Sequence, residues 1–110
     1  MIYEMRIYVC APGRLGALHN RFRTITCRKF AQYGIKVVGF WTDKYGESNR
    51  LTYIVQYDDV ADRDRKWNAF LNDEEWMKAR AASEAPENGG PIVANVINTI
   101  MVPTDYSELQ

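Results

Sequence analysis

Histidine and cysteine are scarce in this chain, which has one histidine and two cysteines in 110 residues. An iron–sulfur cluster needs about four cysteine ligands, and Cys10 and Cys27 are far apart, with no Cys-x-x-Cys motif. A zinc site combines several His, Cys or acidic ligands, and no second histidine joins His19. We therefore expect no metal centre, and we read both cysteines as buried free thiols.

Motifs for nucleotides and for serine hydrolysis are also missing. The sequence contains no Gly-x-Gly-x-x-Gly, no P-loop and no Gly-x-Ser-x-Gly, which are the common signatures of those chemistries. A haem iron would need an axial ligand, and His19 is the only histidine available. The prediction is a protein without a cofactor.

Neither an excess of one charge nor a long apolar run is present. Fourteen basic residues balance fourteen acidic ones, whereas nucleic-acid-binding proteins usually show a basic excess or patch. The apolar start, MIYEMRIYVC, is interrupted by Glu4 and Arg6, so it is neither a signal peptide nor a membrane span. We expect a cytoplasmic protein that binds neither nucleic acid nor membrane.

The chain does contain the pattern of one folded α+β domain. Hydrophobic residues make up 46% of it and aromatic residues 13%, as in globular proteins. We expect a domain over residues 1–103 and a loosely held tail over 104–110. Strands are predicted at 2–9, 35–45, 51–57 and 92–102, and helices at 14–33, 60–71 and 74–85.

Three local signals support these elements. In the first helix, apolar residues from Leu15 to Tyr33 recur at steps of three, four and five, typical of an amphipathic helix. Its basic residues are expected mostly on the solvent side, namely Arg14, Arg21, Arg28 and Lys29. Asp58-Asp59 and Asn72-Asp73 offer N-caps for the two later helices, and Gly39 inside a strand suggests a bulge or a close approach to the backbone.

The order β-α-β-β-α-(α)-β predicts a ferredoxin-like fold, with helices on one face of a four-stranded antiparallel sheet. The strand LTYIVQY at residues 51–57 has no clearly polar face, because alternate side chains point to opposite sides and those on both sides are large and mostly apolar. Leaving that surface wet is unusual for a monomer. Covering about 600 Å² of it would contribute on the order of 15 kcal/mol before association costs. We therefore expect a homodimer, or a larger assembly built from it, in which two sheets face each other as a barrel.

Several segments together resemble the NIPSNAP family. They are YEMRIY at 3–8, Pro12-Gly13, GFW at 39–41, GESNRLTYIVQYDDVADR at 46–63, and the tryptophans Trp67 and Trp76. The resemblance implies a dimeric α/β-barrel protein with a pocket in the barrel or between the sheet and its helices. It implies no assigned activity, since related barrels include monooxygenases and isomerases as well as other enzymes.

Glu4, Arg6 and Tyr8 alternate on one strand face, where polar groups are costly unless they are paired. Inside a barrel, Arg6 would bind an anionic or carbonyl group and Tyr8 would donate a hydrogen bond or a proton. Glu4 is then a candidate for ligand binding on the same face. The structural alternative is a Glu4–Arg6 ion pair at the interface or a partly wet edge.

His19 is the best candidate for a general base, because histidine is the side chain that ordinarily exchanges a proton near neutral pH. The alternative is a residue at the border of the apolar stripe of its helix. Asn49 lies beside the hairpin turn, where Asn is common for structural reasons, but the resemblance to the family adds a ligand-binding role. Trp41 and Tyr53 either line a pocket or pack in the core or interface.

Three functions remain open from the sequence. The first is a dimeric barrel that binds a small apolar or aromatic molecule. The second is a cofactor-independent enzyme of the monooxygenase or isomerase kind, with His19 as base and with Arg6 and Tyr8 stabilising negative charge. The third is a structural or interaction module whose barrel is packed full.

Overall fold

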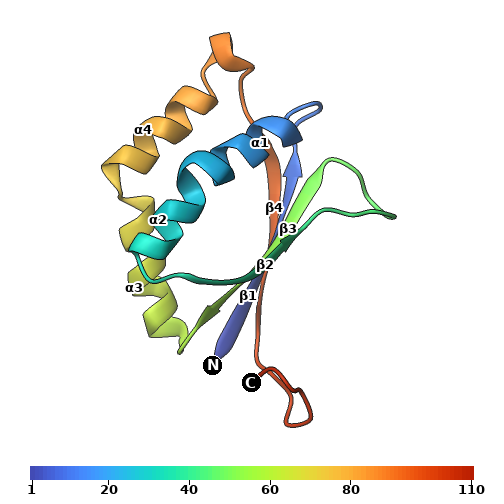
Figure 1. Ribbon diagram of the computed structural model, residues 1–110, viewed down its shortest axis with the longest axis vertical. Helices are drawn as coiled ribbons and strands as arrows, with labels where there is room; N and C mark the ends of the chain where they lie inside the picture. Colours follow the sequence, from blue (N-terminus) through green and yellow to red (C-terminus); the bar gives the residue numbers. More distant parts are fainter.

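The computed structural model describes residues 1–110 as one layer of helices on one antiparallel sheet (Figure 1). The order of elements confirms the predicted α+β ferredoxin-like fold. The strands are β1 (Ile2–Cys10), β2 (Lys36–Trp41), β3 (Arg50–Tyr57) and β4 (Val93–Met101). The helical segments are α1 (Leu15–Arg21), the π-helical turn η1 (Phe22–Thr26), α2 (Cys27–Gln32), α3 (Val60–Leu71), α4 (Glu74–Ser83) and the short 3₁₀ turn η2 (Pro86–Asn88).

The sheet has the strand order β2-β3-β1-β4, and every neighbouring pair is antiparallel. Alternation in β3 is strict: Leu51, Tyr53, Val55 and Tyr57 are buried, and the residues between them are half-buried. Glu4 pairs with Val55, Arg6 with Tyr53 and Tyr8 with Leu51. Because directly paired residues point to the same face, Glu4, Arg6 and Tyr8 face the helices.

The first helical segment is not the continuous α-helix that the sequence predicts. The backbone N–H of Cys27 donates to the carbonyl of Phe22, which closes a five-residue π turn between α1 and α2. Such turns insert one residue into an α-helix and occur often at functional sites. The step of five from Ile25 to Phe30 in the apolar pattern is the trace of this insertion, and both residues are buried.

Both predicted aspartate caps are confirmed. The side chain of Asp59 accepts a hydrogen bond from the Asp62 N–H, and that of Asp73 accepts one from the Trp76 N–H. The predicted bulge is present too, since the β2–β3 register shifts between Val37 and Gly39. A Cβ on Gly39 would lie 2.8 Å from the Trp41 ring, so a larger residue there would require the half-exposed indole to move.

Two basic residues and one cysteine lie elsewhere than expected. Arg21 and Lys29 are buried rather than on the solvent side, because Lys29 forms a 3.0 Å ion pair with Asp73 and Arg21 faces other polar groups described below. Cys10 is buried as expected, but Cys27 is exposed. The second strand ends at Trp41, not at Tyr45, and residues 42–49 form a loop in which Asn49 has a positive φ of 61°.

All four α-helices lie on one side of the sheet, and the other face has no helix over it (Figure 1). The C-terminal tail turns back beside the N-terminus, where the Tyr3 hydroxyl donates to the Gln110 carbonyl at 2.6 Å. The rest of this face carries half-buried or exposed apolar side chains, among them Met5, Ile7, Ile54, Ile97 and Trp41. No helix in the structure combines the length and the apolar character needed to cross a bilayer.

Candidate functional site

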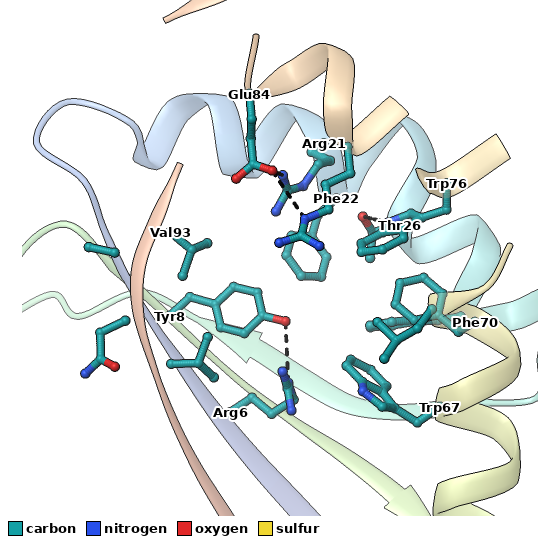
Figure 2. Close-up of a pocket in the computed structure, with 16 residues that line it drawn as sticks. Arg6, Tyr8, Arg21, Phe22, Thr26, Trp67, Phe70, Trp76, Glu84 and Val93 are labelled. Atoms are coloured by element: carbon teal, nitrogen blue, oxygen red, sulfur yellow. Dashed lines mark hydrogen bonds and ion pairs between the residues drawn. The ribbon is translucent and has the colours of Figure 1, made fainter. Parts of the chain in front are cut away.

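A cavity of about 350 Å³ lies between the sheet and the helices (Figure 2). Its walls come from β1, β4, the π turn and the helices α1 to α4. Six of its sixteen lining residues are aromatic, and four charged side chains reach it. Its lining residues include Arg6, Tyr8, Arg21, Phe22, Trp67 and Trp76.

The alternation of β1 brings Arg6 and Tyr8 to the bottom of this cavity. The Tyr8 hydroxyl shares a 2.7 Å hydrogen bond with the Tyr53 hydroxyl, and the Arg6 Nε donates to the Tyr8 oxygen at 3.4 Å. The Arg6 guanidinium lies 4.4 Å from the centre of the Trp67 ring, which is a cation–π contact. Burial raises the pKa of Tyr53 well above its usual value, although the charge of Arg6 opposes the shift. Tyr53 is therefore a neutral hydroxyl that orients Tyr8.

Glu4 lies behind Arg6 and is completely buried. The Arg63 side chain donates to both Glu4 oxygens, at 3.2 and 2.9 Å, and Arg6 approaches at 3.3 Å. Burial alone would raise the pKa of Glu4, but the hydrogen bonds from Arg63 and the charges of both arginines outweigh it and lower the pKa. The expected Glu4–Arg6 ion pair therefore exists, but it lies between sheet and helices rather than at an interface or a wet edge.

The roof of the cavity is built by the π turn and α4. Phe22 and Thr26 begin and end the turn, and the Trp76 indole N–H donates to the Thr26 hydroxyl at 3.2 Å. Trp76 also packs against Phe70, with ring centres 4.4 Å apart. These contacts hold α4 to the first helix and keep the aromatic walls in place.

A second polar group stands at the other end of the cavity, formed by Arg21, Arg80 and Glu84. Figure 2 shows Arg21 and Glu84 at the end opposite to Arg6 and Trp67, with the Tyr8 ring between them. Glu84 is 3.3 Å from Arg80 and 3.9 Å from Arg21. Positive charge therefore exceeds negative charge along the walls.

The three residues predicted as catalytic do not meet in one cavity. His19 is half-buried and lines a separate depression of about 300 Å³, together with Arg23, Phe40 and Trp41. Only Phe22 lines both spaces. The combination of His19 with Arg6 and Tyr8 is thus not assembled by the fold.

The predicted ligand-binding residues are also divided. Tyr53 is buried beneath the cavity and reaches it only through Tyr8, and Glu4 reaches it only through Arg6. Trp41 is half exposed in the other depression. The Asn49 side chain donates to the carbonyls of Cys10 and Ala11, so it holds the loop after β1 and lies away from both spaces.

Sequence reasoning missed Arg21, Thr26, Arg80 and Glu84 as lining residues. A weak signal existed, because Arg21 is three residues after Leu18 and Thr26 is four after Phe22, which places both on the inward side of the helix. Arg80 and Glu84 are also four residues apart. Because Arg21 is charged, the sequence analysis placed it on the solvent side of its helix instead.

Comparisons with known proteins agree on one family. The sequence model described as NIPSNAP matches residues 3–108. The protein NipSnap homolog 3B of Mus musculus is 29% identical over 77 residues, which are 69% of this chain and 30% of the mouse protein. This chain therefore spans less than a third of that relative.

Solved structures share the fold over nearly their whole length. An uncharacterized NIPSNAP domain protein from Burkholderia xenovorans is 21% identical, with a TM-score of 0.79 over 97% of this chain and 98% of that one. A NIPSNAP family protein from Agrobacterium tumefaciens is 22% identical, with a TM-score of 0.83 over 99% and 98% of the two chains.

Proposed function

Because this chain belongs to the NIPSNAP family, whose solved relatives have the same fold without an assigned activity, we propose a function from its own cavity. The protein binds a small, largely aromatic or apolar molecule between its helices and its sheet. One observation carries the proposal: a cavity of about 350 Å³ has six aromatic residues among the sixteen in its walls and charged groups at its two ends.

The size and the composition of this cavity fit a ligand site. Pockets for small molecules are usually about 300–1,000 Å³, mostly apolar, with few polar groups that fix orientation. Tyr8, Phe22, Phe70, Trp67 and Trp76 supply flat apolar walls. This open volume argues against a module whose interior is only packed full.

A panel of small ring compounds tests the proposal by thermal shift. A ligand at one hundred times its Kd stabilises a protein by about 2.7 kcal/mol, which gives a clear rise in Tm. The panel should contain aromatic acids, phenols and neutral ring compounds. No shift with any compound, and no binding by calorimetry at millimolar concentration, would contradict ligand binding.

Substitution of Val96 with Trp is expected to block the cavity. Val96 lines the cavity from β4 and is 40% exposed, so an indole can be placed there without removing core contacts. The affinity for a compound from the panel should fall about tenfold or more, as measured by calorimetry. Val60→Trp is the matched control, since Val60 is exposed at the start of α3 and does not line this cavity. If Val96→Trp and Val60→Trp bind the compound with equal affinity, the compound does not bind in this cavity.

A cofactor-independent enzyme is the second candidate, favoured by the Arg6–Tyr8 contact of 3.4 Å. A phenol beside a guanidinium can donate to a ligand oxygen and stabilise negative charge that develops there. The predicted base does not support this role, because His19 lines the other depression. Mass spectrometry after incubation in air distinguishes the candidates: unchanged ligand supports binding alone, and a converted ligand supports the enzyme.

We also propose that a second copy of the chain covers the bare face of the sheet. The central positions of this face are apolar or uncharged, including Met5, Ile7, Ile54 and Ile97. Two such faces can meet without charge repulsion, and the chain has no helix of its own to cover them (Figure 1). An apolar face of this kind is typical of a protein–protein contact.

Ile97→Lys is expected to convert the dimer into a monomer. Ile97 pairs with Ile7 near the middle of the bare face and is 45% exposed in one chain. A lysine there would bury an unpaired charge in the proposed interface. Size-exclusion chromatography with light scattering measures the mass, and Val60→Lys is the control that should remain a dimer. A monomeric wild-type protein at micromolar concentration would disprove the interface.

A further inference from the structure

The positive charge around the cavity is not balanced by the protein. Three arginines line the cavity, Arg6, Arg21 and Arg80, and one carboxylate, Glu84. Behind Arg6, Glu4 is shared with a further arginine, Arg63. Arg63 also pairs with Asp64 at 3.1 Å. Even with this second layer, four guanidinium groups face three carboxylates.

The arginines differ in how well they are satisfied. Arg6 is paired with Glu4 and lies against Trp67. Arg80 is half exposed, so water can solvate it. Arg21 is only 7% exposed, and its Nε is buried without a hydrogen-bond partner.

The remaining contacts of Arg21 are weak for a buried cation. Its Nη1 donates to the Ser83 hydroxyl at 3.2 Å and lies 3.9 Å from Glu84. A guanidinium has five N–H donors, and Glu84 is shared with Arg80. Burial lowers the pKa of Arg21 and the charge of Arg80 lowers it further, while Glu84 opposes both. Among the three arginines that line the cavity, Arg21 is therefore the one that an additional anion would stabilise most.

We propose that the ligand is an aromatic or apolar carboxylate whose anionic group binds Arg21, with its ring among the aromatic walls. The proposal deepens the proposed function and rests on it. The planar fork of an arginine matches a carboxylate with two parallel hydrogen bonds. The rings of Phe22 and Trp76 adjoin Arg21 in the same cavity, so the charged and the flat parts of one molecule can be held together.

A pair of isosteric probes tests this inference: 2-naphthoate and its neutral amide, 2-naphthamide. The wild-type protein is expected to bind the carboxylate about tenfold more tightly or better, because hydrogen bonds to charged groups are stronger than neutral ones. Arg21→Gln should abolish this preference, and Arg21→Lys should keep part of it. Arg23→Gln is the matched control, because Arg23 is exposed two residues further along and does not line this cavity.

The outcomes separate this inference from the proposed function. Equal affinity of the wild-type protein for both probes overturns the anion preference and leaves ligand binding intact. A preference that survives in Arg21→Gln overturns the role of Arg21. Failure of both probes to bind contradicts the inference and the cavity as a site for ring compounds of this size. The comparison on the wild-type protein decides the anion preference even if Arg21→Gln does not fold.

Discussion

Substitution of Glu4 with Gln is expected to lower the free energy of unfolding by about 3 kcal/mol. Glu4 is completely buried and balances Arg6 and Arg63 within 3.3 Å. Glutamine keeps the shape but leaves two partly buried guanidinium groups without their carboxylate. Breaking a buried ion pair costs about 3–5 kcal/mol, and the partial exposure of both arginines places this case at the lower end.

Urea denaturation followed by circular dichroism measures the loss. Glu74→Gln is the control, because Glu74 pairs with Lys78 on the surface of α4 and exposed pairs contribute less than about 1 kcal/mol. An equal effect in both variants would mean that the buried cluster contributes no more than a surface pair.

The effect of Glu4→Gln should also depend on pH. The pKa of Glu4 is lower in the folded protein than its ordinary value, so the stabilisation by its carboxylate is complete above the unfolded-state pKa of about 4.3. It is lost as the pH falls through the folded-state pKa. The difference between wild type and variant should therefore shrink in acid.

Trp76→Ala is expected to cost about 3–5 kcal/mol of stability, the usual range for removing a buried tryptophan. Trp76 is 8% exposed, packs on Phe70 and bonds to Thr26. Its loss removes the main contact of α4 with the rest of the core and opens the cavity roof. We therefore expect weaker binding of ring compounds at temperatures where the variant is still folded.

Met77→Ala is the control for this change. Met77 follows Trp76 on the same helix and is 50% exposed, so its truncation should cost less than about 1 kcal/mol. Both variants introduce alanine into α4, so the helix propensity of the introduced residue is the same. A similar loss in both would show that α4, rather than the indole, is the sensitive element.

The fold was predictable from the sequence because its signals are local. Alternation from Leu51 to Tyr57 identified a strand with one buried face, and Asp59 and Asp73 marked the beginnings of two helices. The order of elements then left few ways to cover the sheet. The extra residue of the π turn appeared in the sequence only as the five-residue spacing between Ile25 and Phe30. Such a spacing also occurs in a regular α-helix with one apolar position filled by a polar residue, so periodicity alone did not identify the turn.

The site was less predictable because it depends on contacts between distant residues. Arg6 and Tyr8 were singled out because polar groups on a covered strand face are costly. The expected position inside a barrel between two sheets is wrong, since both side chains face the helices. Arg21 was assigned to solvent because a lone charge on a helix normally is, and its partners Ser83 and Glu84 lie more than sixty positions away. Helical periodicity placed His19 at the border of the apolar stripe, but it did not show that the residue lines a different depression from Arg6 and Tyr8.

The π-helical turn determines where insertions and deletions belong when the sequences of related proteins are aligned. An α-helix turns by about 100° per residue, so the loss of one codon between Phe22 and Thr26 would rotate α1 by that angle relative to α2. Arg21 would leave the cavity, and its contacts with Ser83 and Glu84 at the end of α4 would be lost. Homologues should therefore be aligned with their insertions or deletions inside this helix, and those without the extra residue should lack the guanidinium group of Arg21 at this end of the cavity.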